Sequence, residues 1–202
     1  MNIPKVIFKY AYPFDQNRRD LYKERGWSDY PVTDQVRKRV EEYEALWADF
    51  NKDDKIIKRI IEFLGVNYPR DIEAYVFGTG MQPMSTPFLI PIIGKRGNYT
   101  GDQFIELIVH ELIHIFAAGT QENPKLKNYW KIIRETYKDE PVLVQNHLIV
   151  YAVVETILTE LFGKEKMKEL IKVDSPEYQR SIELTEQLGP EKIIDEFKNL
   201  TK

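Results

Sequence analysis

The chain has 202 residues, of which 43% are hydrophobic, so it is long and apolar enough to bury one substantial core. Its net charge of −3 at pH 7 provides no overall field that would favour nucleic acid or an anionic membrane surface, and neither partner is expected. The absence of cysteine excludes disulfides, thiolate metal ligands and cysteine nucleophiles. A transition metal would therefore have to be held by His, Asp or Glu.

Sorting signals are not evident. Residues 1–14 lack the apolar core of a signal peptide, and no run approaches the roughly 20 apolar residues that span a bilayer. A cytoplasmic protein is the simplest interpretation, although a mature chain stripped of its signal would look the same.

Residues 1–32 are rich in aromatic side chains. The alternation of Val6, Phe8, Tyr10 and Tyr12 predicts a short strand. Basic residues between the aromatics would also suit a nucleic-acid surface. The slightly acidic balance of the chain instead favours an N-terminal arm packed on the core.

The next segments predict two helices and two strands. Residues 33–50 place apolar side chains at three- and four-residue steps, which is typical of a helix, and 53–64 form a second helix that Gly65 ends. Residues 72–77 and 87–93 read as strands of a small sheet, with a glycine-containing loop at 94–101.

The remainder of the chain is predicted to be helical. A helix over 102–118 ends at Gly119, and further helices cover about 123–137, 141–162, 164–172, 176–187 and 190–199. This order predicts a mainly helical α+β fold with a small sheet before the helix at 102–118. We expect a single domain over 1–202, with 1–32 as the arm and 164–202 as C-terminal helices.

The helix at 102–118 carries the sequence HELIH, which matches the H-E-x-x-H pattern. His110 and His114 are four residues apart, so a helix places both imidazoles on one face, where they can bind one metal ion. Glu111 is rotated by about 100° from His110, beside the metal, where its carboxylate can activate a water. The flanking residues are apolar on all sides, so three buried polar groups would need partners. The alternative is a pair of core histidines bonded to backbone or carboxylates.

Catalytic zinc usually takes three protein ligands and one water. His147 is the only other histidine, and Glu155 lies on the same predicted helix. If the helices at 102–118 and 141–162 pack antiparallel, His147 lies at the depth of His114 and Glu155 lies further away. His147 is thus the predicted third ligand and Glu155 the alternative, or a carboxylate that holds a ligand histidine in place.

Two further residues are candidates for supporting roles. Tyr151 follows His147 by one helical turn and could donate a hydrogen bond to the oxyanion of a tetrahedral intermediate, or simply pack. Glu106 precedes His110 by four residues and could orient it, or be an ordinary helix residue.

On these residues the chain resembles the zincin metallopeptidases, over the region from the strand at 87–93 to about residue 162. The resemblance implies a Zn²⁺ cofactor and an upstream strand whose edge pairs with an extended peptide, although 87–93 could equally be a buried strand. A metzincin would have Gly and His at the positions of Ala117 and Thr120, and a peptide deformylase would need a cysteine. A gluzincin would use a later glutamate, which Glu155 could supply. The resemblance is therefore to a compact, gluzincin-like zincin.

The sequence leads to three functional hypotheses. The first is a zinc peptidase acting on a peptide or protein, with Glu111 as base and then acid. The second is a zinc hydrolase that uses the same residues on another amide or ester. The third is a non-enzymatic protein whose zinc, with Glu155 as a fourth ligand, only braces two helices.

Overall fold

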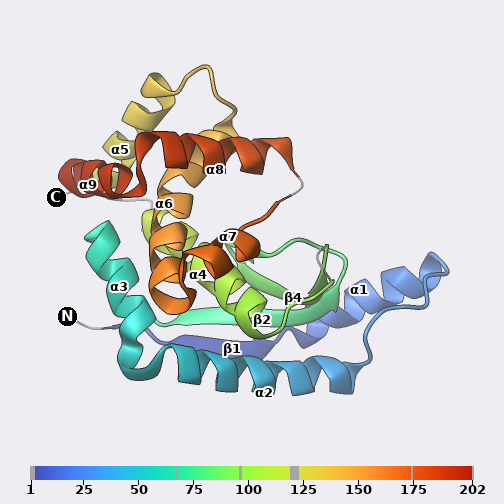
Figure 1. Ribbon diagram of the computed structural model, residues 1–202. Helices are drawn as coiled ribbons and strands as arrows, with labels where there is room; N and C mark the ends of the chain where they lie inside the picture. The colour runs from blue at the N-terminus through green and yellow to red at the C-terminus, as the bar shows by residue number, and fades with distance from the viewer. Residues whose placement is uncertain (1–2, 67, 96, 119–122, 174, 202) are drawn as a thin grey trace. The chain divides into compact units, whose positions relative to one another are not determined.

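The computed structural model describes residues 3–66, 68–95, 97–118, 123–173 and 175–201 (Figure 1). It divides into two compact units, each described here by itself. The sheet unit comprises Asn2–Asp53 and Pro69–Glu111, and the helical unit comprises Asp54–Tyr68 and Leu112–Lys202. The predicted α+β class, mainly helical with a small sheet, is confirmed.

A mixed sheet forms the centre of the sheet unit. Its long strands are β1 (Val6–Tyr10), β2 (Ile72–Thr79) and β4 (Phe88–Gly94), and they run parallel in the order β1-β2-β4. The apolar run of β4 is buried from Phe88 to Ile92, as expected for a parallel strand covered on both faces. The two-residue strands β3 (Met84–Ser85) and β5 (Gly97–Asn98) pair antiparallel with β4 and were not predicted.

The aromatic N-terminal segment contains a helix that the alternating pattern did not predict. Strand β1 ends at Tyr10 and α1 (Tyr12–Glu24) begins two residues later, with a proline in its first turn. The predicted extension of the strand to Tyr12 is therefore wrong. Asp15 explains why the chain turns here: its carboxylate is fully buried and accepts hydrogen bonds from the hydroxyls of Tyr10 (2.7 Å) and Tyr30 (2.6 Å) and from the amide of Gly78 (2.7 Å).

Helix α2 (Thr33–Phe50) packs against β1 and β2. Its buried Tyr43 stacks on Phe104 with ring centroids 3.8 Å apart, and Phe104 also contacts Phe8 of β1. Phe104 lies on α4 (Gly101–Ala118), which was predicted almost to the residue. The part of α4 up to Glu111 belongs to the sheet unit. Gly119, the predicted end of this helix, lies outside the described residues.

Helix α6 (Val142–Phe162) is the core of the helical unit. Helices α7 (Lys164–Leu170), α8 (Pro176–Leu188) and α9 (Pro190–Thr201) pack along it, and α3 (Lys55–Leu64) and α5 (Pro124–Thr136) complete the unit. All six helices were predicted from their periodicity and their flanking Gly and Pro residues. Asn123 caps α5 by accepting from the amides of Lys125 and Leu126.

Helix α6 is also long and apolar enough to cross a membrane, the one such helix among the described residues. The expectation that no apolar run is long enough to span a bilayer was therefore wrong, as judged by length and composition alone. Most of its apolar window, 72%, is buried inside the protein. This burial is typical of the core helix of a soluble protein, and α6 carries the buried polar residues His147 and Glu155.

Candidate metal centre

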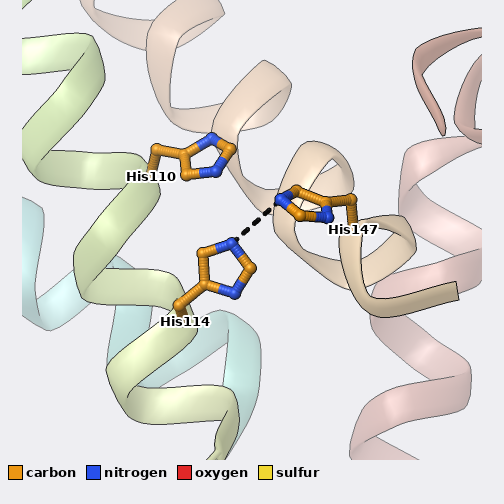
Figure 2. A group of neighbouring side chains, drawn as sticks. All are labelled: His110, His114 and His147. Atoms are coloured by element: carbon orange, nitrogen blue, oxygen red, sulfur yellow. Dashed lines mark hydrogen bonds between the residues drawn. The ribbon is translucent and has the colours of Figure 1, made fainter. Parts of the chain in front are cut away.

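Two of the three candidate histidines are positioned by α4 alone. His110 and His114 are one helical turn apart on this continuous helix, and both are partly exposed. Their neighbours Ile108, Val109, Leu112 and Ile113 are buried, which holds this stretch of helix in place. Figure 2 shows both rings projecting from the same side of α4.

His147 approaches His114 from the first turns of α6. Its side chain is 7% exposed, and its Nδ1 lies 2.8 Å from the backbone carbonyl of Leu143, one turn earlier. Because a carbonyl only accepts hydrogen bonds, Nδ1 carries the proton and Nε2 presents its lone pair. That Nε2 lies 3.2 Å from Nε2 of His114 (Figure 2). The predicted match in depth between His114 and His147 is confirmed by this contact.

The three side chains together have the geometry of a metal site. One ligand nitrogen from each of His110, His114 and His147 lies within 4.8 Å of the others. Two imidazole nitrogens bound to a tetrahedral zinc at about 2.1 Å are ~3.4 Å apart. The 3.2 Å between Nε2 of His114 and Nε2 of His147 is close to that separation.

The charge state of the histidines also suits a metal. Burial, with a smaller contribution from His147, lowers the pKa of His114 to about 3. Burial likewise lowers the pKa of His147. Both rings are therefore neutral at pH 7, which is the form that ligates metals. The alternative, a proton on Nε2 of His114 donated to His147, would fit the same distance.

Glu111 is placed beside this group by its position next to His110 on α4. It is partly exposed, and burial, with a smaller contribution from Glu106, raises the pKa of its carboxyl to about 8. A group with such a pKa can both take and return a proton near neutral pH. Glu106, the suggested orienting residue, is buried one turn earlier, and its charge acts on Glu111.

Glu155 lies outside the cluster formed by the three histidines. It follows His147 by two helical turns, is 7% exposed, and its Oε1 has no hydrogen-bond partner in the described part of the chain. Burial and the charge of Glu186 raise the pKa of its carboxyl to about 7, opposed by Lys164. The carboxylate and the ammonium that act on Glu155 come from α8 and α7, respectively.

Two tyrosines flank His147. Tyr151, the predicted oxyanion donor, is 2% exposed, and its ring centroid lies 5.8 Å from that of His147. Tyr178, on α8, is partly exposed and meets the His147 ring edge to face at 4.8 Å. Tyr178 was missed because 31 residues separate it from His147, and no spacing rule links residues on different helices.

No protein-family model, curated protein or solved structure matches this chain.

Proposed function

We propose that this protein is a cytoplasmic zinc-dependent hydrolase, and specifically a peptidase of the compact, gluzincin-like zincin type. The observation that carries the proposal is the convergence of three imidazoles, with ligand nitrogens within 4.8 Å of one another, directly beside Glu111 of an H-E-x-x-H sequence. A chain with only three histidines brings all three to one place.

Each residue has a defined role in the proposed reaction. His110, His114 and His147 would hold Zn²⁺, which supplies a Lewis acid for the substrate carbonyl and a water with a pKa near 7. Glu111 takes a proton from the attacking water and returns it to the leaving amine. Helix α4 presents Glu111 to the same region as His110 without requiring it to bind the metal. Tyr151 or the more accessible Tyr178 would donate to the developing oxyanion.

The number of protein ligands favours catalysis over a structural site. A structural zinc usually has four protein ligands, whereas the cluster found among the described residues consists of three histidines and excludes Glu155. Three ligands leave a coordination position for water. The same geometry would serve hydrolysis of another amide or an ester. A peptide or protein substrate is proposed from the zincin resemblance, with neither a nucleic acid nor a membrane as a partner.

The proposal is tested by measuring zinc content and peptide hydrolysis on the same preparations. Glu111→Gln should retain one zinc per chain and lose turnover by at least about a thousandfold, because the shape of the site is kept while the base is removed. Glu155→Gln, a matched change of another buried glutamate, should retain both zinc and turnover. Full activity in Glu111→Gln, or zinc that survives His147→Ala unchanged, would contradict the proposal.

A further inference from the structure

Arg134 projects from α5 onto the start of α6. Its Nη1 donates to Oε1 of Gln145 at 2.7 Å, and its Nη2 donates to Oδ1 of Asn146 at 2.5 Å. Gln145 cannot turn away, because its Nε2 donates to the carbonyls of Tyr137 and Glu140, both at 2.8 Å. The guanidinium is therefore held in a fixed orientation by two amide oxygens.

These partners leave the charge of Arg134 uncompensated. Both acceptors are neutral amides, and no carboxylate in the described part of the chain forms an ion pair with Arg134. Glu135, the next residue on the helix, is 3.8 Å from Lys131 instead. Two of the five guanidinium N–H groups donate to these amides, the other three have no hydrogen-bond partner among the described residues, and the side chain is partly exposed. Burial lowers the pKa of Arg134, as expected for a cation without an acidic partner.

Helix α5 also contacts α6, which carries His147, and the end of α4, which carries His114. Trp130, one turn before Arg134, donates from Nε1 to the carbonyl of Ala117 at 3.3 Å, three residues after His114. The Arg134 guanidinium lies 5.8 Å from the Trp130 ring centroid. Its acceptor Asn146 immediately precedes His147. Arg134 is thus bonded to the residue before His147, and its neighbour Trp130 is bonded to the turn of α4 that follows His114.

We propose that Arg134 binds a carboxylate of the substrate, so that the proposed peptidase acts on peptides with a free C-terminal carboxylate close to the scissile bond. An immobilised guanidinium with free N–H groups suits the two oxygens of a carboxylate. This inference rests on the proposed function for the location of the scissile bond. The binding of a carboxylate beside the metal centre can nevertheless be measured without turnover.

Binding to the zinc-loaded Glu111→Gln protein provides the test. Isothermal titration is carried out with an N-acetylated tripeptide as the free acid, with its C-terminal amide, and with an amidated tripeptide that has one acidic side chain. The free acid should bind at least about tenfold more tightly than the neutral amide, because a charge-assisted contact is lost in the amide. Tight binding of the acidic amidated peptide instead would show that Arg134 reads an acidic side chain and would overturn the C-terminal assignment.

Substitutions of Arg134 assign the preference to its side chain. Arg134→Gln should abolish the difference between acid and amide, and Arg134→Lys should restore part of it, since lysine keeps the charge without the planar fork. Lys131→Gln, a cation removed from the same helix, should retain the full difference. Thermal unfolding of each variant shows whether the contact between α5 and α6 survives the substitution. The comparison of the free acid with the amide uses protein that retains Arg134, so it does not depend on the folding of the variants.

The outcomes separate the two proposals. Equal affinity for acid and amide with Arg134 intact, or a preference that survives Arg134→Gln in a folded protein, would overturn the role of Arg134. A clear preference for the acid combined with no hydrolysis by the zinc-loaded protein that retains Glu111 would instead overturn the peptidase proposal and leave the carboxylate site standing.

Discussion

His147 donates its Nδ1 proton to the carbonyl of Leu143 and thereby aims the lone pair of Nε2 at Nε2 of His114, 3.2 Å away. The backbone of α6 thus fixes both the tautomer and the orientation of the third imidazole. A histidine positioned in this way loses little freedom when it binds a metal. The same contact joins α4 to α6, so a shared metal would stabilise the packing of the two helices.

Zinc is expected to raise the stability of the folded protein. A ligand that binds only the native state at a free concentration of 100 Kd contributes about 2.7 kcal/mol. For a chain of this size, that corresponds to a rise in Tm of roughly 5–10 °C. Differential scanning calorimetry with buffered zinc would measure the rise, and a chelator should reverse it.

The control for the zinc effect is a change of the third ligand. His147→Ala should remove most of the rise in Tm, whereas Glu155→Gln should keep it, because Glu155 lies outside the cluster of histidines. A rise that persists unchanged in His147→Ala would show that zinc binds elsewhere.

Some residues of the candidate site could be predicted from the sequence and others could not. His110, Glu111 and His114 followed from helical spacing, which is a local property of one segment. The contact of His114 with His147 could be anticipated only by assuming how two distant helices pack. Tyr178 and Arg134 could not be found at all, because their relation to His147 depends on where α8 and α5 lie relative to α6.

The fold shows the same division between local and tertiary information. The long helices of the helical unit have apolar periodicities and terminal Gly or Pro residues, and all were predicted. Helix α1 was missed because the alternation of Tyr10 and Tyr12 continued the pattern of β1. The burial of Asp15, which ends the strand pattern, depends on donors at Tyr30 and Gly78 that are distant in sequence.

Asp15 is expected to be the most important single polar residue for the stability of the sheet unit. Its buried carboxylate accepts from Tyr10, Tyr30, Gly78 and Arg19, the last at 2.9 Å. Asp15→Ala would leave these donors without their acceptor and should lower the free energy of unfolding by about 3–5 kcal/mol. Urea denaturation would measure the loss.

Asp20→Ala on the same helix is the matched control for Asp15. Asp20 is half exposed, and its ion pair with Lys23 is long, at 4.0 Å. Its removal should therefore change the stability by less than about 1 kcal/mol. Similar losses for the two variants would refute the special role of Asp15.

Removal of the Tyr129 hydroxyl is expected to stabilise the folded protein. The residue is 1% exposed and packs edge to face on Phe197 with ring centroids 4.6 Å apart, but its hydroxyl is buried with no hydrogen-bond partner in the described chain. Tyr129→Phe should therefore raise the free energy of unfolding by roughly 1 kcal/mol, since a desolvated hydroxyl is removed while the ring contacts remain. A clear loss of stability in urea denaturation would indicate that the hydroxyl has a partner.

Glu155 should make the stability of the helical unit depend on pH. Burial and Glu186 raise the pKa of its carboxyl from 4.5 to about 7, so the folded protein holds this proton more tightly than the unfolded chain. The protonated carboxyl therefore favours folding at low pH, and this contribution is lost as the pH rises from about 4.5 to 7. The loss amounts to roughly 2 kcal/mol once partial solvation of the carboxylate is allowed for.

Glu155→Gln isolates this contribution, because the amide stays neutral throughout. The variant should differ little from the parent near pH 4.5 and become the more stable protein by pH 7.5, with the difference developing between these values. Lys164, which opposes the shift, supplies a second check. Lys164→Gln removes a favourable charge and should raise the pKa of Glu155 further, so the decline in stability should extend to a higher pH than in the parent. Urea denaturation across this pH range measures all three proteins. A constant difference between Glu155→Gln and the parent would mean that Glu155 has the same pKa in the folded and unfolded protein, and the assignment of a raised pKa would be wrong.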